Sequence, residues 1–572
     1  MRLSRFKAYT KQNNLSGKTA HIFSSFFVGL TFTYLSLGGF SKLNPRNIDW
    51  IYGDNITAYI AQLFYIEDQW RFPLATNPNY GAELSTSLSF TGPPIPLAIF
   101  QKIFLIPSNL QLFGFWFALI FIFQAFFAIS ICRELQYSLT QSVGLSILFF
   151  TPFLLQRTQF HYWLSAHFLI LWAILLIIRF FKYSKVSKLQ SSVLLVFSYL
   201  INGYLFVMVL IILSYMWLHY IQNGSKSRKR AIIDLIWINL PMPVSLFIFE
   251  GINSQNNLYE SIRMTFGGGY GSYPFNLISF INPFVGFTDF YTGGKNEDAI
   301  TLNFSSFDYS FGATKGSYEG FMYLGLGVIL MIVLTFLKSD IQSDRKIKVN
   351  KKITIIYFSL ITLFSVTYRV SIGSNEVNLK FPYLGTWALS TFRASSRFMW
   401  IIAYIILILA IWKLHKKYKK LILNSLIVTI LFTQGMDLYK PVIQRFASQE
   451  FSKSKMRLTN KEWDSNESFF RKFETIRTFP VGNGVTNWDK ISFMSWKVKA
   501  TSDSIQSSRP NFVRIKKMYE QNYSAICSGS IKPGVLYGVP KDYINLLSDC
   551  DLRKLKKRFI NNEFFFWTEY ER

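Results

Sequence analysis

Residues 110–132, LQLFGFWFALIFIFQAFFAISIC, form an apolar segment without a charged side chain. About 20 such residues span the hydrocarbon core of a bilayer when they form a helix. A helix is favoured there because it satisfies its own backbone hydrogen bonds, which lipid cannot. Similar segments recur along the first three-quarters of the chain. The sequence therefore predicts an α-helical polytopic membrane protein.

We expect about eleven transmembrane helices in a chain of 572 residues, half of them hydrophobic and 18% aromatic. The predicted spans lie near 22–40, 110–132, 139–155, 163–180, 189–203, 204–220, 231–250, 319–337, 353–371, 397–412 and 421–436. The fifth and sixth meet at Asn202-Gly203 and form either a tight hairpin or one long bent helix. The first span lacks a small-residue cleavage site, so we interpret it as a retained anchor.

The distribution of basic residues predicts the orientation. A net charge of +29 would suit nucleic acid, but the basic residues lie in short clusters between apolar segments, which is typical of cytoplasmic loops. We expect no nucleic-acid partner. Besides the basic N-terminal tail, the clusters are Lys182-Lys185-Lys188, Lys226-Arg228-Lys229-Arg230, Arg345-Lys346-Lys348-Lys351-Lys352 and Lys416-Lys417-Lys419-Lys420.

All of these clusters face the cytoplasm if residues 189–220 cross the membrane twice. The large loops 41–109, 251–318 and 372–396 then lie outside, as does the tail 437–572. This arrangement predicts a multi-pass protein of the bacterial inner (plasma) membrane, with a transmembrane domain over 1–436. Its N-terminus is cytoplasmic and its C-terminal domain is extracytoplasmic, or periplasmic.

The first outer loop contains the densest polar chemistry. After Gly53-Asp54, apolar side chains at helical spacing from Ile56 to Phe64 predict a short amphipathic helix on the membrane surface. Polar residues end this helix, namely Glu67, Asp68 and Arg71. A later apolar segment, 97–106, is too short to span and is expected to be re-entrant or interfacial.

Asp54 is the candidate catalytic residue of this loop. A carboxylate there can take a proton from a sugar hydroxyl, or hold a divalent cation (Mg or Mn) that steadies a departing phosphate. Alternatively, Asp54 or Asn55 caps the amphipathic helix. Glu67, Asp68 and Arg71 are substrate-binding candidates as well. For Glu67 and Asp68 the alternative is a solvated helix end.

Other outer regions supply candidate substrate-binding residues. Arg157 and His161 suit an anionic lipid phosphate, or else anchor the chain at the interface. His167 lies within the fourth span, where ionisable groups are usually functional, although a hydrogen-bonded core histidine is the alternative.

Three further candidates stand where spans begin. Glu319 lies at the outer end of the eighth span. Arg393 and Arg397 are four residues apart and are expected to share one helical face that suits a phosphate or pyrophosphate. Their alternative is snorkelling to lipid headgroups. The glycine-rich segment 266–271 lacks a strand-helix context and is interpreted as a flexible loop, not a dinucleotide site.

The tail is too charged to span, and its pattern indicates a small α+β domain. Segments 478–481 and 530–537 resemble strands and turns, whereas 541–547 and 551–559 resemble helices. Of the three cysteines, Cys132 ends a span, and Cys527 and Cys550 lie in the tail. In an oxidising outer compartment Cys527 and Cys550 are expected to form a disulfide.

The order of these motifs resembles an uncharacterised bacterial family of polytopic membrane proteins grouped with the GT-C class of membrane glycosyltransferases. The resemblance covers nearly the whole chain. At Gly92, where that family often has an acidic residue, this sequence departs from the pattern. The motifs that carry it are Gly53-Asp54, Trp70-Arg71-Phe72-Pro73, 91–97, 157–167, Asn276-Leu277, 318–327 and 392–398.

The resemblance implies a hexosyltransferase-type reaction at the outer face of the inner membrane. Such an enzyme passes a sugar from a polyprenyl-phosphate donor to a lipid, glycan or protein acceptor. Asp54 matches the family's first-loop aspartate, a base or metal-linked orienter. Arg157, His161, Arg393 and Arg397 would then contact the carrier phosphate.

Two other functions stay open at this stage. A flippase for lipid-linked glycans would show polar residues along several spans near the midplane. A polysaccharide polymerase or ligase would also use outer-face Arg and His on a lipid-linked donor. The sequence does not identify the sugar, the acceptor or the metal requirement.

The predicted topology can be tested with reporters fused after residue 572. Because every basic cluster then faces inward, we expect a reporter that works only outside the cytoplasm to be active there. A C-terminal fusion active in the cytoplasm would contradict the odd number of spans.

Overall fold

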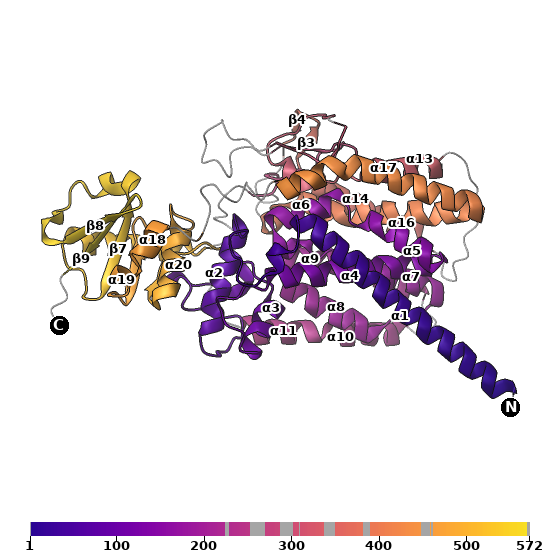
Figure 1. Ribbon diagram of the computed structural model, residues 1–572, viewed down its shortest axis with the longest axis horizontal. Helices are drawn as coiled ribbons and strands as arrows, with labels where there is room; N and C mark the ends of the chain where they lie inside the picture. The colour runs from indigo at the N-terminus through magenta and orange to yellow at the C-terminus, as the bar shows by residue number, and fades with distance from the viewer. Residues whose placement is uncertain are drawn as a thin grey trace.

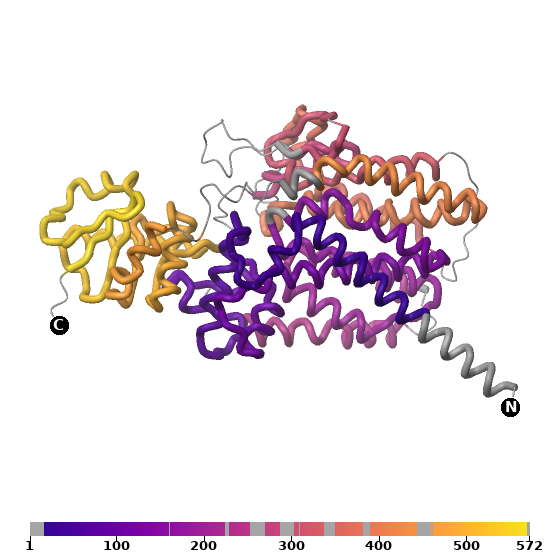
Figure 2. Tube along the Cα trace, in the orientation of Figure 1, coloured from indigo at the N-terminus to yellow at the C-terminus, as the bar shows by residue number. Residues whose placement is uncertain are grey.

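The computed structural model describes residues 2–223, 228–251, 269–286, 301–307, 309–336, 349–380, 389–447, 458, 461–508 and 510–568 (Figure 2). Three glycine-rich-loop residues, 266–268, lie outside these ranges, as do Lys226, Arg345, Lys346 and Lys348 of the basic clusters.

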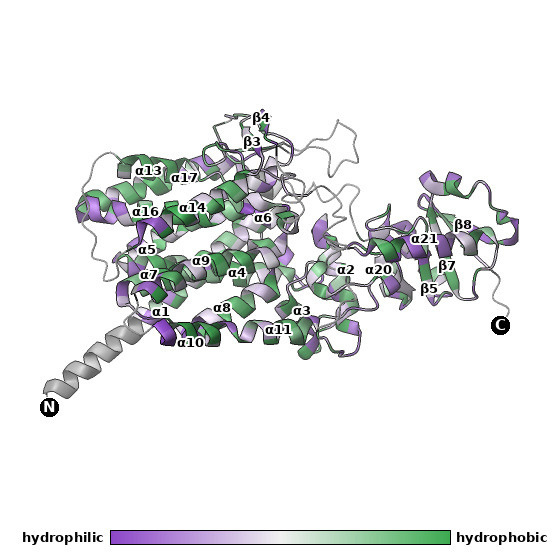
Figure 3. Cartoon of the chain, turned by 180° about the vertical axis from the view of Figure 1, so that it is seen from behind, coloured by the Kyte–Doolittle hydropathy of each residue, from purple (hydrophilic) through white to green (hydrophobic). Residues whose placement is uncertain are grey.

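The described part of the chain is mostly helical and contains seven helices long and apolar enough to cross a membrane. They form one bundle in which hydrophobic residues predominate (Figure 3). The membrane-protein class agrees with the sequence, whereas the exact number of crossings stays a prediction. The helices that supply these candidates are α1 (Arg2–Leu37), α4 (Phe113–Glu134), α7 (Phe168–Tyr183), α9 (Gly203–Asn223), α10 (Arg228–Asn239) with α11 (Pro241–Glu250), α16 (Met399–Lys417) and α17 (Lys420–Ala447).

Several predicted spans are shorter or more broken than the hydropathy suggests. The third becomes α5 (Leu139–Ser146) and, after a turn, α6 (Pro152–Phe160), with a 60° bend that makes it an eighth candidate if the pair is one span. Pro152 explains the break, since proline cannot continue a preceding helix. The eighth predicted span retains only α13 (Leu326–Phe336), and the ninth retains α14 (Lys351–Val366).

The segment 189–220 forms two helices packed against each other, α8 (Lys188–Ile201) and α9. Asn202 between them is extended, with φ −166° and ψ 135°, so the chain turns back there. The hairpin alternative therefore describes this segment, and the single bent helix does not.

The described parts of the loops 41–109, 251–318 and 372–396 lie with the C-terminal domain at one end of the bundle, and the basic α16–α17 connection lies at the other end (Figure 1). Short elements cover the loop end: α2 (Asp54–Glu67), η2 (Ala82–Leu84), η3 (Leu88–Phe90), α3 (Ile95–Ile103), the hairpin β1 (Phe284–Gly286) and β2 (Thr301–Asn303), and the hairpin β3 (Arg369–Ile372) and β4 (Asn375–Asn378). This separation agrees with the predicted topology, while the orientation itself stays a prediction.

The predicted amphipathic helix is present as α2, but its surroundings differ from the expectation. Every residue from Asn55 to Tyr65 is buried. The helix packs against α3 and against α20 (Trp488–Val498) of the C-terminal domain. Protein therefore covers the face that we expected to meet water.

The C-terminal domain is a five-stranded mixed sheet in the order β6-β5-β7-β9-β8. β5 is parallel to β6 and β7, and β9 is antiparallel to β7 and β8. Adjacent strand residues such as Leu536 and Tyr537 belong to separate cores, because strand side chains alternate between the two faces. Its elements are α18 (Lys461–Ser465), α19 (Glu467–Phe470), β5 (Thr475–Thr478), α20, β6 (Thr501–Ser502), α21 (Phe512–Cys527), β7 (Val535–Pro540), η11 (Lys541–Leu547), η12 (Leu552–Lys554), β8 (Lys556–Ile560) and β9 (Glu563–Trp567).

One secondary-structure prediction in this domain is wrong. Residues 551–559 were expected to be helical, but most of them form the short η12 and strand β8. Asn561 and Asn562, with φ of 46° and 64°, make the two-residue turn that pairs β8 with β9. Nearby, Cys527 at the end of α21 is joined to Cys550 by a disulfide, with Cα atoms 4.4 Å apart. Cys132 is buried in α4.

Glu563 predicts how the stability of the domain depends on pH. Its side chain is buried and accepts a hydrogen bond of 2.6 Å from Asn487, and burial raises its pKa to about 8. The folded state therefore holds a proton that the unfolded state releases near pH 4.5, so the contribution to stability is lost as pH rises from about 4.5 to 8. In full-length protein, the wild-type domain should lose several degrees of melting temperature between pH 5 and pH 9 relative to Glu563→Gln.

Thermal proteolysis read out on the C-terminal fragment measures this difference. Glu520→Gln, an exposed substitution on α21, serves as the control and should follow the wild type. If the melting temperatures of wild type and Glu563→Gln changed equally with pH, the raised pKa of Glu563 would be contradicted.

Candidate functional site

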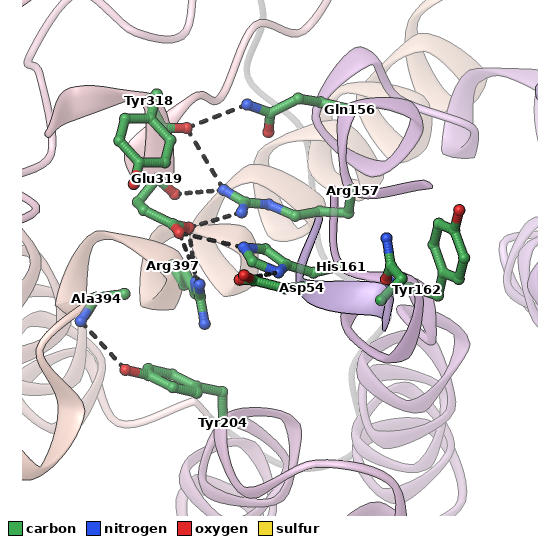
Figure 4. Close-up of polar contacts among 11 residues, drawn as sticks. Asp54, Gln156, Arg157, His161, Tyr162, Tyr204, Tyr318, Glu319, Ala394 and Arg397 are labelled. Carbon is green, nitrogen blue, oxygen red and sulfur yellow. Dashed lines mark hydrogen bonds and ion pairs between the residues drawn. The ribbon is translucent and has the colours of Figure 1, made fainter. Parts of the chain in front are cut away.

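Five ionisable side chains meet at the loop end of the bundle, and we call them the charge cluster: Asp54, Arg157, His161, Glu319 and Arg397 (Figure 4). They come from four separate segments, which are the start of α2, the end of α6, η7 (Ser317–Gly320) and η9 (Ser395–Phe398). All five were candidates from the sequence, but their meeting was not predicted.

Glu319 is the centre of the cluster and is 4% exposed. Arg157 Nη1 donates to its Oε2 at 2.6 Å, and Arg157 Nη2 donates to the Glu319 carbonyl at 2.8 Å. Arg397 binds the same carboxylate through two nitrogens, at 2.9 Å and 2.8 Å. Two guanidinium groups at these distances strongly favour the ionised form of a buried carboxyl.

Aromatic rings flank both arginines. The Arg157 guanidinium carbon lies 5.4 Å from the centre of the Trp400 ring, and that of Arg397 lies 4.6 Å from the centre of the Tyr204 ring. Such contacts stabilise a cation through the ring quadrupole. The Tyr204 hydroxyl also accepts a hydrogen bond from the Ala394 amide at 3.2 Å, which fixes the ring beside η9.

Local sequence explains how these segments approach each other. Thr151 caps the start of α6, because its hydroxyl accepts from the Leu154 amide, and at the end of the helix the His161 amide donates to the Arg157 carbonyl at 3.0 Å. Gly320 lets η7 pack on η9, because a Cβ there would lie 2.9 Å from Ser396 Cβ. Any larger residue would push Glu319 away from Arg397.

His161 stands between the two carboxylates of the cluster. Its Nδ1 is 3.5 Å from Asp54 Oδ2, and its Nε2 is 3.5 Å from Glu319 Oε1. The Asp54 side chain is 32% exposed, against 5% for Glu319. Asp54 is therefore the carboxylate of the cluster that an incoming molecule can reach.

Asp54 is not the N-cap residue of α2. The N-cap of α2 is Gly53, whose φ of 58° is a conformation that favours glycine. Asp54 follows as the first helical residue, where its charge suits the helix dipole. Asn55 instead accepts a hydrogen bond from the Tyr162 amide at 3.1 Å, which joins α2 to the segment after His161.

A family model described as "Domain of unknown function (DUF6311)" matches residues 26–439. The chain belongs to this family. The matched region contains all five residues of the charge cluster and ends before the C-terminal domain. A search of curated proteins found no match.

Other candidates within the DUF6311 region lie away from the cluster. Glu67, Asp68 and Arg71 lie at the far end of α2, about 20 Å along the helix from Asp54 at 1.5 Å per residue. There Glu67 accepts from Ser108 at 2.6 Å, and Arg71 pairs with Asp68 at 3.2 Å. Glu67 and Arg71 are exposed, as a solvated helix end requires, whereas the Asp68 side chain is only 5% exposed.

His167 is fully buried inside the bundle. Its Nδ1 is 3.0 Å from the Tyr404 hydroxyl, and its ring centre is 4.3 Å from that of Trp400. The Gln124 amide also donates to the Tyr404 hydroxyl, at 3.2 Å. His167 thus fits the alternative of a hydrogen-bonded core histidine.

Arg393 and Arg397 do not share a continuous helical face. Ala394, with φ −89° and ψ 57°, separates η8 (Ser390–Phe392) from η9. Arg397 binds Glu319 in the cluster, whereas Arg393 lies near Tyr273, where burial raises the pKa of the tyrosine hydroxyl and the charge of Arg393 opposes this rise. The spacing rule failed because it assumes an unbroken α-helix.

Sequence reasoning missed the residues that hold the cluster in place. Gln156 donates to the Tyr318 carbonyl at 3.2 Å, and Trp400 and Tyr204 flank the arginines. Their position within or beside apolar segments was a weak signal, since aromatic residues are common there. Within the described ranges, no group of three or more His, Cys, Asp or Glu side chains forms a metal site.

Glu319→Gln should destabilise the protein markedly, because it leaves two buried guanidinium groups without a carboxylate. Removing one partner of a buried ion pair costs about 3–5 kcal/mol. We expect low abundance and early aggregation on heating, measured by size-exclusion chromatography in detergent.

Glu376→Gln is the matched control. Arg369 also binds Glu376 through two nitrogens, at 3.0 Å and 2.6 Å, but both side chains are about 20% exposed. This second substitution should cost about 1 kcal/mol or less. If Glu319→Gln and Glu376→Gln lost equal stability, the burial of the charge cluster would not explain the effect of Glu319→Gln.

Proposed function

We propose that this protein is a membrane glycosyltransferase of the GT-C type. It would pass a sugar from a polyprenyl-phosphate donor to a lipid, glycan or protein acceptor at the outer face of the inner membrane. The observation that carries the proposal is Asp54, a partly exposed carboxylate at a helix start, 3.5 Å from His161, whose other ring nitrogen faces the Glu319 carboxylate that binds two arginines.

Asp54 acts as the general base in this proposal. Its carboxylate takes the proton from the acceptor hydroxyl as that oxygen forms a bond to the anomeric carbon of the donor sugar. The bond from this carbon to the phosphate oxygen breaks, and the electron pair leaves with the polyprenyl phosphate. His161, when protonated, stabilises the ionised Asp54 and supplies positive charge near the departing phosphate.

Glu319 does not fit the role of the base. Both of its carboxylate oxygens accept hydrogen bonds from arginines, and its side chain is only 5% exposed. A carboxylate held in this way is a poor proton acceptor. Glu319 instead keeps Arg157 and Arg397 in place, so that the site contains one more guanidinium group than Glu319 alone neutralises.

Two arginines against Glu319 leave one positive charge, which the ionised Asp54 balances before the donor arrives. Once Asp54 has taken the acceptor proton, this positive charge is available to the departing phosphate, which guanidinium groups bind well. Within the charge cluster Asp54 is the accessible carboxylate that a divalent cation would meet, so we derive no metal-dependent step.

The placement of the cluster supports this reading. It lies at the bundle end that also holds the large loops and the C-terminal domain (Figure 1). A lipid-linked donor presents its phosphate at the membrane interface, where the candidate spans end. The outer orientation belongs to the proposal, because it rests on the basic clusters of the sequence.

Asp54→Asn tests the proposal. Asn retains the shape of the side chain but cannot accept the proton, so activity should fall by about a hundredfold or more at normal abundance. Cell-surface and lipid-linked glycan are measured beside the protein level.

Asp49→Asn is the control, since Asp49 is an exposed carboxylate of the same loop. This variant should retain activity. Near-normal glycosylation by Asp54→Asn at normal abundance would refute Asp54 as the base.

A further inference from the structure

The C-terminal domain is hydrogen-bonded to the first outer loop, about 400 residues earlier in the chain. The contact centres on residues 502–508, which begin at the last residue of strand β6 and which we call the docking segment. Tyr80 of the loop forms a parallel β-bridge with Ser502, so the loop covers the free edge of β6. The Ser508 amide also donates to the Phe90 carbonyl at 2.9 Å.

Gln506 connects the docking segment to α2. The Thr57 hydroxyl donates to the Gln506 side-chain oxygen at 3.2 Å. Tyr80, which is completely buried, donates its hydroxyl to the Gln506 carbonyl at 3.0 Å and accepts from the Gln506 amide at 3.2 Å. Thr57 lies three residues after Asp54, and therefore about one helical turn from it on the same side of α2.

An ion pair adds a second connection. Arg477 of β5 donates to both carboxylate oxygens of Glu83, at 2.6 Å and 2.7 Å. Arg514 donates to the Glu83 carbonyl at 3.2 Å. Arg477 also lies 3.7 Å from Asp503 of the docking segment, and burial raises the pKa of Asp503 to about 6 although Arg477 opposes this shift.

Apolar packing completes the contact. Ile505 is 2% exposed and lies so close to Gly81 that a Cβ there would be 2.5 Å from its Cδ1. Gly81 also has a φ of 89°, which disfavours other residues. Ile505 and Phe493 of α20 belong to the same hydrophobic core as α2. The loop and the domain therefore share one core instead of meeting at a wet surface.

We propose that the C-terminal domain positions Asp54, through the docking segment and α2, with Gln506 and Arg477 as positioning residues. The domain is then a required part of the site, although the DUF6311 region ends before it. The role in catalysis rests on the proposed function, whereas the mechanical connection to α2 does not.

A charge exchange tests the connection in the full-length protein. Arg477→Glu and Glu83→Arg each place like charges together, so hydrogen exchange of the α2 amides should rise by about tenfold or more. The double variant restores an opposite pair and should return exchange towards the wild-type rate. The control is Arg553→Glu, the same charge change on a side chain that is 91% exposed.

The same variants are assayed for glycosyl transfer, where positioning predicts a lower kcat with an unchanged KM for the lipid-linked donor. Gln506→Leu should lower kcat in the same way, and Gln506→Glu, which retains the acceptor for Thr57, should recover most of it. The inference would be overturned if the α2 amides exchanged hydrogen at the same rate in Arg477→Glu and in Arg553→Glu. Faster exchange combined with no glycosyl transfer by the wild type would support the connection and refute the proposed function instead.

Discussion

The buried carboxylate of Glu319 is the group on which the site depends. Burying an unpaired charge is costly, and Glu319 removes that cost for two arginines at once. One of these arginines lies 162 residues before it and the other 78 residues after it. The carboxylate therefore joins η7 to α6 and η9, and this arrangement pairs all three buried charges.

This arrangement gives two carboxylates in one site different chemical roles. Two guanidinium groups bind the Glu319 carboxylate. Asp54 instead faces Nδ1 of His161 at 3.5 Å, and its side chain is 32% exposed. The Glu319 carboxylate is held by two arginines while the Asp54 carboxylate stays accessible, and this is how the site separates a structural charge from a reactive one. The ring of His161 lies between the two carboxylates, and each of its nitrogens faces one of them.

The sequence predicted the membrane class and the members of the charge cluster, but not the contacts between them. Apolar segments indicated the membrane class, and ionisable residues at their outer ends identified all five members of the charge cluster. The sequence could not show which of them meet, because contacts such as Arg157 with Glu319 join distant segments. Local rules also failed where the backbone departs from a helix, as at Ala394, and where an Asn-Asn turn pairs strands β8 and β9.

The helix α2 was expected to lie on the membrane surface, but the C-terminal domain covers it, and this difference has a general cause. An apolar stripe beside a polar face fits a helix on a membrane surface, and it fits equally well a helix covered by another domain. Strand β6 has only two residues, and a bare edge strand invites unwanted pairing unless something covers it. Tyr80 covers that edge, and α20 covers α2 in return. Because each partner buries what the other would expose, the first outer loop and the C-terminal domain reach their stable form together.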